Sequence, residues 1–252
     1  MSEAEAALSC DALLGGRVRL WQPRRGYRAA TDPVFLAAAC PARPGERVLD
    51  LGCGAGAAAL CLAARVPALA LHGLELQPDY AALARRNALE NGAGLVVHEG
   101  DVAAPPPALR AESFDHVIAN PPYFAATDAP SPAPDRDAAR REGAEGVGLW
   151  IDAGLRRLRQ GGALTLIHRA ERLDAILVAL EGRAGAIEVL PLCPRAGRPA
   201  GRVLLRARKD RRGPLRLLWP FVIHEGAAHA GDAPDFTEAA LAMLRDGAPA
   251  PF

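Results

Sequence analysis

The sequence predicts an α/β protein built on a doubly wound, mainly parallel sheet, and three observations lead to this prediction. Strand-like and helix-like segments alternate from residue 32 to residue 119 at the spacing of βα units. A glycine-rich turn at residues 52–56 joins the first strong strand to a helix. Four of the expected strands end in a glycine or a polar residue, and ligands of such sheets bind at the carboxyl ends of the strands.

The first half of the chain is expected to alternate regularly. Residues 32–40 predict a helix with Asp32 as its N-cap and Pro33 at its first position. Asn91 and Gly92 form a usual C-terminal cap and end a longer helix. The expected strands are residues 47–51, 68–74, 95–98 and 114–119, and the helices between them are residues 57–65 and 78–90.

The second half begins with a long segment that has no periodicity. Residues 125–147 are rich in alanine, proline and aspartate, and a long loop of this kind in a compact domain is often a lid or a binding loop. The turn-rich residues 210–214 join the last two expected strands, which predicts an antiparallel hairpin at the end of the sheet. The elements expected here are helices at residues 148–159, 171–180 and 236–244 and strands at residues 162–168, 187–190, 202–208 and 215–223.

The composition is that of a globular protein. The chain has 252 residues and 50% of them are hydrophobic, which suffices for one substantial α/β domain. No stretch approaches the roughly 18 consecutive apolar residues of a membrane span, and the N-terminus lacks the basic region of a signal peptide. Five scattered cysteines without a C-x-x-C pair indicate neither a disulfide framework nor a zinc site. We therefore expect a cytoplasmic protein without membrane segment or metal.

The charge is unevenly distributed along the chain. Residues 1–150 hold 14 basic and 18 acidic side chains, whereas residues 151–252 hold 16 basic and 11 acidic ones. The net charge of +1 does not by itself predict affinity for nucleic acid. A local basic surface in the second part of the chain is compatible with these numbers.

The glycine turn is the first candidate binding element. Gly52, Gly54 and Gly56 fit a tight strand-to-helix turn, where the backbone needs unusual dihedral angles and a ligand approaches closely. A dinucleotide-binding G-x-G-x-x-G pattern would require glycine at the position of Ala57. The turn alone does not decide between cofactors, because glycine-rich turns also bind NAD and FAD.

The string D-L-G-C-G-A-G at residues 50–56, with Glu75 at the end of the next strand, resembles motifs I and II of the class I methyltransferases. The resemblance implies S-adenosylmethionine as cofactor and a Rossmann-like fold with a mainly parallel seven-stranded sheet. It implies that Glu75 accepts both ribose hydroxyls, which two carboxylate oxygens can do; an NAD ribose is the alternative. Asp101 would bind the adenine amino group, or serve only as a turn aspartate. Asp50 would face the methionine ammonium, or only hold the glycine loop.

The motif Asn120-Pro121-Pro122-Tyr123 is the candidate catalytic element. An exocyclic amine is a poor nucleophile because its lone pair is delocalised into the ring. Two acceptors, the Asn120 side-chain oxygen and the Pro121 carbonyl, would bind its two hydrogens and favour a pyramidal nitrogen. The two prolines hold these acceptors in place beforehand. Tyr123, with Phe124, offers a face for stacking the acceptor base. The alternative is a proline turn that ends a strand.

Segments before and after these motifs point to a narrower family. Together with NPPY, they resemble the bacterial family of valine-tRNA adenine-N6 methyltransferases, which modify the adenine beside the anticodon. The resemblance runs from about residue 11 to residue 245. The segments that carry it are Gly15-Gly16-Arg17-Val18, Gln22-Pro23, Gly26-Tyr27-Arg28, Thr31-Asp32 and Phe221-Val222-Ile223-His224.

This resemblance implies further roles along the chain. Tyr27, Thr31 and Asp32 would lie beside the methionine end of the cofactor, and Asn120 would contact both cofactor and acceptor. Residues 1–252 would form one methyltransferase domain, in which residues 1–45 contribute to the cofactor site and residues 125–147 form a substrate loop. The loop and the tail depart from the family by being rich in proline, arginine and alanine, so the particular tRNA stays open.

RNA, most plausibly tRNA, is the expected partner, and a monomer is the default. On the loop, Arg136, Arg140 and Arg141 are candidate RNA contacts. Strand alternation would place Arg202, Arg206 and Arg208 on one face. That row would either contact phosphates or form a solvated edge that blocks strand pairing.

Three rival functions remain at this point. A protein-glutamine N5-methyltransferase acting on release factors shares the NPPY motif, but such enzymes usually carry a helical domain ahead of the cofactor domain. Here only 49 residues precede Asp50 and many of them are typical of turns. A DNA adenine methyltransferase would need a target-recognition domain, for which the chain has no room. A non-catalytic cofactor-binding or RNA-binding protein would not need to keep Asn120 and Tyr123.

Overall fold

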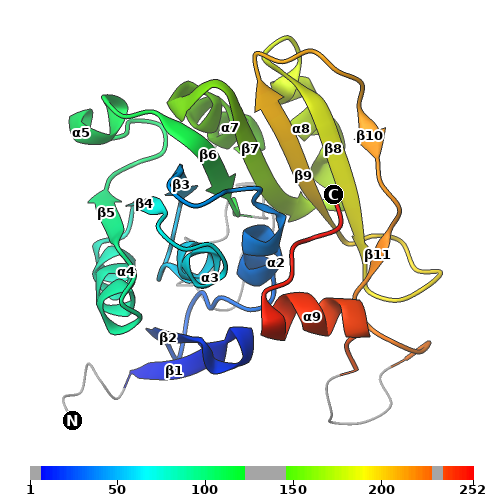
Figure 1. The fold of residues 1–252 in the computed structure, drawn as a ribbon, viewed down its shortest axis with the longest axis horizontal. Helices are drawn as coiled ribbons and strands as arrows, with labels where there is room; N and C mark the ends of the chain where they lie inside the picture. The colour runs from blue at the N-terminus through cyan, green and yellow to red at the C-terminus, as the bar shows by residue number, and fades with distance from the viewer. Residues whose placement is uncertain (1–6, 123–145, 229–234) are drawn as a thin grey trace.

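The computed structural model describes residues 7–122, 146–228 and 235–252. Figure 1 shows a central twisted sheet with helices on both faces, and a small second sheet beside it. The strands are β1 Leu8–Leu13, β2 Val18–Pro23, β3 Arg47–Leu51, β4 Ala70–Glu75, β5 Leu95–Glu99, β6 Phe114–Ala119, β7 Leu158–Arg169, β8 Ala184–Cys193, β9 Arg202–Lys209, β10 Arg216–Leu217 and β11 Phe221–Val222. The helices are α2 Asp32–Ala39, α3 Ala57–Arg65, α4 Pro78–Glu90, α5 Pro107–Arg110, α7 Gly146–Arg157, α8 Leu173–Leu180 and α9 Glu238–Asp246, with short 3-10 turns η1 Leu14–Gly16 and η2 Ala170–Arg172.

The main sheet confirms the predicted parallel architecture. Its strands follow the order β10-β8-β9-β7-β6-β3-β4-β5, and β11 also pairs with β8. The pairs β3–β4, β4–β5, β3–β6 and β6–β7 are parallel. Strands β3 to β9 match seven of the eight expected strands, and the eighth, residues 215–223, is present as the two-residue strands β10 and β11 at the edge beyond β8. The described sheet thus has nine strands, where the resemblance implied seven. After β3 the chain adds β4 and β5 on one side of β3 and then returns to add β6 on its other side. A crevice therefore opens at the carboxyl ends of β3 and its neighbours.

The antiparallel pair near the C-terminus is present, but its partners differ from the predicted ones. β9 pairs antiparallel with β7 on one side and with β8 on the other. Residues 215–223 therefore cannot pair with β9. Because proline lacks an N–H and Pro220 interrupts this stretch, it forms only β10 and β11, both parallel to β8.

The N-terminal segment is more regular than its turn-like composition suggested. β1 and β2 form an antiparallel hairpin in continuous register from Leu8 opposite Pro23 to Leu13 opposite Val18. Asn87 of α4 and Asn91, the C-cap of that helix, attach β2 to the main domain. Asn87 accepts the backbone N–H of Trp21, and Asn91 accepts that of Arg19. Expecting turns was wrong because the hairpin's short, mixed strands lack a clear alternating pattern.

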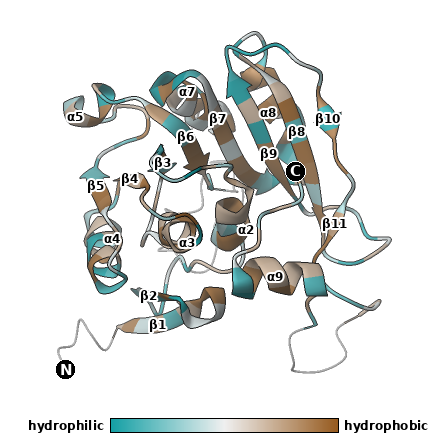
Figure 2. Cartoon of the chain, in the orientation of Figure 1, coloured by the Kyte–Doolittle hydropathy of each residue, from teal (hydrophilic) through white to brown (hydrophobic). Residues whose placement is uncertain are grey.

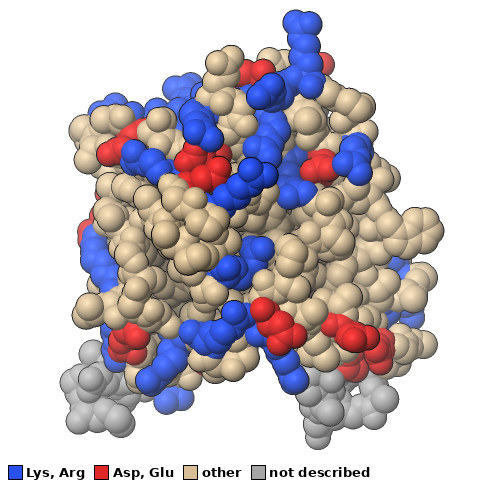
Figure 3. Space-filling view, in the orientation of Figure 1, with Lys and Arg blue, Asp and Glu red and all other residues tan. Residues whose placement is uncertain are grey.

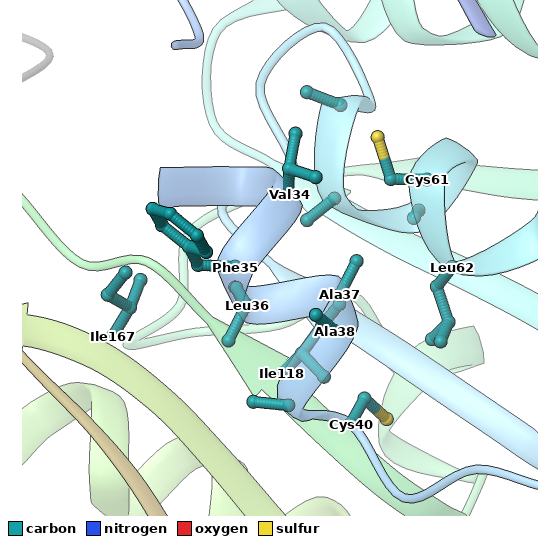
Figure 4. Close-up of a cluster of buried hydrophobic side chains, with 14 of the residues drawn as sticks. Val34, Phe35, Leu36, Ala37, Ala38, Cys40, Cys61, Leu62, Ile118 and Ile167 are labelled. Carbon is teal, nitrogen blue, oxygen red and sulfur yellow. The ribbon is translucent and has the colours of Figure 1, made fainter. Parts of the chain in front are cut away.

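Helix α2 is the centre of the hydrophobic core on one face of the sheet. All of its residues are buried, although helices at a surface usually expose one side. Figure 4 shows Phe35 and Leu36 of α2 among side chains from α3 and from the strands, including Ile118 and Ile167. Figure 2 shows hydrophobic residues along the same helix and strands. A second core cluster, on the opposite face, packs α7 and α8 against the sheet.

Within the described ranges no helix is both long and apolar enough to cross a membrane. Cys40, Cys53, Cys61 and Cys193 are buried free thiols, while Cys10 is exposed.

Candidate active site

The ends of four parallel strands meet around one cavity of about 650 Å³. Asp50 is the next-to-last residue of β3 and the glycine turn follows it, Glu75 ends β4, Asp101 follows β5 and Asn120 follows β6. These side chains are separated by up to 70 residues in the sequence, and the parallel topology alone brings them together. The convergence that the sequence predicted is therefore present in the fold.

The glycine turn adopts backbone conformations that favour glycine. Gly52 has a φ of +65° and Gly54 a φ of +56°. At Gly52 a side chain is excluded for a second reason, because a Cβ there would lie 2.5 Å from Cη2 of Trp150. Gly52 and Gly54 line the cavity, whereas Gly56 is not among the lining residues and instead opens α3 with a φ of +89°.

Glu75 is held rigidly at the cavity wall. Its Oε2 accepts the backbone N–H of Gly54 at 2.9 Å, and its Oε1 accepts that of Gln77 at 2.9 Å. The residue is only 6% exposed. Each carboxylate oxygen has a second lone pair, so the two oxygens can still accept hydroxyl groups of a ligand. The arrangement suits the predicted bidentate contact with a ribose.

Asp50 is a buried acid with one oxygen that lacks a partner. It is 3% exposed, and no donor in the described part of the chain reaches its Oδ2. Desolvation by burial raises the pKa of Asp50 to about 8, and the negative charge of Glu75 acts in the same direction. A backbone hydrogen bond from Ala59 opposes this rise only in part. A cation bound in the cavity would compensate this carboxylate.

Asn120 lines the cavity beside Tyr27. Its Nδ2 donates to the Tyr27 hydroxyl at 3.4 Å, and the hydroxyl of Tyr80 donates to the Tyr27 carbonyl at 2.9 Å. Pro121 and Pro122 line the same cavity. The carboxamide is therefore placed at the strand end by fixed backbone and by an aromatic neighbour from the N-terminal segment.

Asp101 serves as a turn aspartate, because its Oδ1 accepts the backbone N–H of Ala103 at 2.9 Å. It also lines the cavity, next to Val102. Its contact with the adenine amino group stays a prediction.

The segment before α2 is held against the cavity by the N-terminal hairpin. Gln22 is 2% exposed, and its Oε1 accepts the backbone N–H of Ala29 at 2.8 Å. Arg28 donates to Asp11 at 2.5 Å and to the Pro23 carbonyl at 2.7 Å. These contacts fix residues 27–31, of which Tyr27 and Thr31 were predicted to lie beside the cofactor. All residues from 27 to 33 line the cavity.

The predicted N-cap role of Asp32 is wrong. Helix α2 begins at Asp32 and Thr31 occupies the cap position. The Asp32 carboxylate instead forms an ion pair with Arg202 of β9, with 2.7 Å between Oδ2 and Nε. Both residues line the cavity, so the predicted place of Asp32 near the cofactor agrees with the fold.

The predicted arginine row of β9 is not at a free edge. β9 has a partner strand on each side, so the interpretation as an edge that blocks strand pairing is wrong. Arg206 pairs with Glu188 at 3.2 Å and lies 3.7 Å from the ring centroid of Phe252. Arg208 donates to the Gly161 carbonyl at 3.4 Å. Phosphate binding by this row stays a prediction, and these intramolecular contacts compete with it.

Several predicted residues lie outside the described part of the chain. They are Tyr123, Phe124, Arg136, Arg140 and Arg141. Their predicted roles in stacking and RNA contact therefore rest on the sequence alone.

Sequence reasoning missed part of the cavity wall. Tyr80 and Trp150 come from the buried sides of α4 and α7, and Gln22 comes from the unrecognised hairpin. A helical pattern marks such side chains as core residues and does not indicate that they border a cavity. The lining residues that were not assigned to the site are Gln22, Arg28, Ala29, Ala30, Pro33, Cys53, Ala55, Ala57, Ala58, Leu76, Gln77, Tyr80, Val102, Ala103, Leu149, Trp150 and Arg202.

The described residues contain no group of three or more histidine, cysteine, aspartate or glutamate side chains arranged to hold a metal ion.

Comparisons with known proteins agree with this geometry. Residues 31–136 match the family described as methyltransferase small domain. The chain is 33% identical, over 73% of its length and 77% of the relative, to a tRNA1(Val) (adenine(37)-N6)-methyltransferase of Aeromonas hydrophila. It is 40% identical to a release factor glutamine methyltransferase of Geobacter sulfurreducens, but over only 32% of its length and 28% of the relative. The crystal structure of a predicted O-methyltransferase from Agrobacterium tumefaciens has a TM-score of 0.69 and 29% identity, covering 87% of this chain and 98% of that one.

Proposed function

We propose that this chain, which belongs to the family of tRNA1(Val) (adenine(37)-N6)-methyltransferases, methylates N6 of an adenine in tRNA. It is an S-adenosylmethionine-dependent N-methyltransferase with the Rossmann-like class I fold that the sequence predicts. The observation that carries the proposal is the position of Asn120 and Pro121, at the end of β6 and in the same cavity as the cofactor acids.

The residues present fit the cofactor. S-adenosylmethionine has an ammonium, two ribose hydroxyls and an adenine, and the cavity offers a matching group to each. The unpartnered Oδ2 of Asp50 suits the ammonium, the fixed carboxylate of Glu75 suits the hydroxyls, and Asp101 suits the adenine amino group. The sulfonium of the bound cofactor supplies an electrophilic methyl group.

The protein's own contribution to transfer is orientation of the acceptor amine. The Asn120 carboxamide oxygen and the Pro121 carbonyl accept the two amine hydrogens, which favours a pyramidal nitrogen with its lone pair directed at the methyl group. The new N–C bond forms as the S–C bond breaks, and the electron pair of that bond leaves with sulfur. The nitrogen then loses one proton to solvent. No basic side chain is required, because the proton becomes acidic only after transfer.

The resemblance to glutamine methyltransferases defines the second candidate function. A glutamine amide also presents a planar NH2 group, and the match to the release factor enzyme covers 32% of this chain. Ahead of β3, however, residues 7–46 form a β-hairpin and a single buried helix that complete the cofactor cavity. The tRNA methyltransferase of Aeromonas hydrophila, by contrast, aligns with 73% of this chain. This longer match favours RNA as the acceptor.

The test is a direct comparison of acceptors. The protein is incubated with S-adenosylmethionine carrying a radiolabelled methyl group and with total tRNA, ribosomal RNA or release factor, and the labelled product is digested and identified. We expect label in N6-methyladenosine from tRNA. Label in N5-methylglutamine, or in RNA at another atom, would replace the proposed acceptor while leaving the cofactor assignment intact.

A further inference from the structure

Trp150 is, with Tyr80, one of the two large aromatic side chains of the described cavity wall to which the sequence motifs assign no role. It lies on α7 and lines the cavity together with Leu149. Its six-membered ring touches the cofactor turn, since Cη2 and Cζ3 lie 2.5 and 2.7 Å from the point where a Cβ of Gly52 would be. The indole therefore fills the space above the first glycine of motif I.

The position of Trp150 is fixed by buried packing. Val147, Ile151 and Leu155 of α7 are buried against the sheet. Gly154, one turn after Trp150 and on the same side of the helix, allows close approach, because a Cβ there would lie 2.9 Å from Cδ1 of Leu164. The indole thus enters the cavity from a helix that cannot easily move away.

The cavity wall also contains large apolar side chains, which suit the apolar faces of a purine. Leu76 follows Glu75 and Val102 follows Asp101, so each stands beside an acid expected to bind the adenosine part of the cofactor. Leu76 is 62% exposed, which is unusual for a large hydrophobic side chain inside a cavity unless a ligand covers it. Leu149 and Trp150 supply apolar surface from α7 to the same cavity.

We propose that Trp150 is a cofactor-contacting residue, whose indole packs against the adenosine part of S-adenosylmethionine. Aromatic side chains bind planar bases through their faces and edges without needing hydrogen bonds. Because the Trp150 ring of α7 also contacts Gly52 after β3, bound cofactor would lie between β3 and α7. The inference concerns the cofactor alone and does not depend on which acceptor is methylated.

The first test uses tryptophan fluorescence, because the chain has only three tryptophans. Trp21→Phe and Trp219→Phe leave Trp150 as the only emitter. Trp219 is 89% exposed, so its replacement should not disturb the fold. We expect S-adenosylmethionine, S-adenosylhomocysteine and adenosine each to change the Trp150 emission, with a Kd equal to that measured by calorimetry. Methionine alone should leave the emission unchanged.

The second test distinguishes direct contact of Trp150 with the cofactor from a purely structural role of this residue. Base–aromatic stacking measured by alanine substitution is worth about 1–3 kcal/mol, so Trp150→Ala should weaken adenosine and cofactor binding by about tenfold or more. Trp150→Phe keeps an aromatic ring and should stay within about threefold of wild type. If Trp150→Ala fails to fold, the fluorescence titration and the Phe variant still decide the question.

Two outcomes would overturn the proposal. The first is saturating cofactor binding by calorimetry without any change in Trp150 emission. The second is a response to methionine but not to adenosine, which would place the indole at the amino-acid end. None of these readouts requires an active acceptor, so failure of the RNA proposal would be recognised separately.

Discussion

Asn120 is the residue on which the proposed reaction depends most directly. Asn120→Ala removes one of the two acceptors for the amine, and loss of a single preorganised polar group in an active site costs about 10²–10³ in kcat. We expect the Kd for S-adenosylmethionine, measured by calorimetry, to stay within a few fold of wild type. Tyr27→Phe is the matched control, since it removes only the hydroxyl that contacts Asn120 at 3.4 Å. It should lower kcat much less. An Asn120→Ala variant with normal turnover would refute the mechanism.

Asp50 should couple cofactor binding to pH. Burial and the charge of Glu75 raise its pKa from 3.8 to about 8, so the folded cofactor-free protein holds a proton that the unfolded chain releases. The resulting stabilisation is complete below pH 3.8 and is lost as the pH rises through about 8. Between pH 5 and 9 the wild type should therefore lose stability relative to Asp50→Asn.

The cofactor's ammonium favours the charged form of Asp50. At pH 7, binding should then release up to about one proton. Calorimetry in two buffers of different ionisation enthalpy measures this release, which should be absent in Asp50→Asn. Equal release by both proteins would show that the proton comes from another group.

Alanine substitutions at Gly52 and Gly92 distinguish the cost of backbone strain from the cost of having no space for a side chain. Their φ angles are alike, +65° and +61°, but only Gly52 has an atom of another residue where a Cβ would lie. Gly92→Ala should cost about 1–2 kcal/mol of unfolding free energy, the usual cost of a left-handed alanine. Gly52→Ala should cost more and should also weaken cofactor binding. Denaturant unfolding and calorimetry measure the two effects, and equal costs without loss of binding would contradict the contact with Trp150.

Much of the site could be predicted at the residue scale because its motifs are local. Glu75 ends a strand, Gly52 and Asn120 each follow one directly, and the parallel topology brings these positions to one cavity. Trp150 and Gln22 could not be found in this way. Their part in the cavity results from how α7 and the hairpin pack, and a single sequence carries no periodic signal for that.

At the scale of elements, the N-terminal hairpin depends on a helix for its position. Asn87 of α4 is fully buried. It accepts the N–H of Trp21 at 2.8 Å, and donates to the carbonyls of Trp21 and Ala55, both at 2.9 Å. One side chain therefore links α4, β2 and the glycine turn. The helix itself was predicted well, but an asparagine inside its pattern gives no hint of such partners.

Asn87→Ala should consequently lower both stability and cofactor affinity. Leaving buried backbone groups without partners costs about 1–3 kcal/mol, and the freed Ala55 carbonyl belongs to the cofactor turn. Asn91→Ala is the matched control, because Asn91 binds the backbone of Arg19 in the same manner near the surface. It should cost less stability and should leave the cofactor Kd unchanged. Thermal unfolding and calorimetry of the two variants give the comparison.

At the same scale, the strand pairing near the C-terminus shows a limit of local prediction. A turn between residues 209 and 215 suggested a hairpin, and the segments on both sides are indeed extended. The choice of partner was decided elsewhere, because β7 and β8 occupy both sides of β9. Pairing of this kind depends on long-range competition, which alternation and turn residues do not encode.

At the scale of the whole molecule, several arginine side chains are neutralised by ion pairs with acidic side chains of the same protein. Figure 3 shows basic side chains spread over this face, with smaller groups of acidic ones among them. Several arginines of the basic second part of the chain are engaged in ion pairs, such as Arg195 with Asp235 and Arg216 with Glu188. A simple count of arginines therefore overstates the surface that is ready to bind phosphate.

The N-terminal hairpin and the C-terminal segment both pack into the core around α2, and this should make the protein unfold as one unit. The Ala250 N–H donates to the Ala38 carbonyl at 2.9 Å, and Arg65 Nε donates to the Gly247 carbonyl at 2.9 Å. One core cluster contains Leu20 of the hairpin, all of the apolar residues of α2 and Met243 of α9. The strands of the sheet contribute to this cluster on one face and to the second cluster on the other.

We propose on this basis that residues 1–252 form a single cooperative domain, and two tryptophans can test it. Trp21 lies in the N-terminal hairpin and Trp219 at the opposite edge of the main sheet. Variants that keep only one of them as emitter should give coincident urea midpoints, because a two-state transition is seen equally by every probe. Saturating S-adenosylmethionine should raise both midpoints equally, since it binds only the folded state. An earlier midpoint for Trp21 would instead mean that the hairpin detaches first, and that residues 1–45 form a separately folding part of the cofactor site.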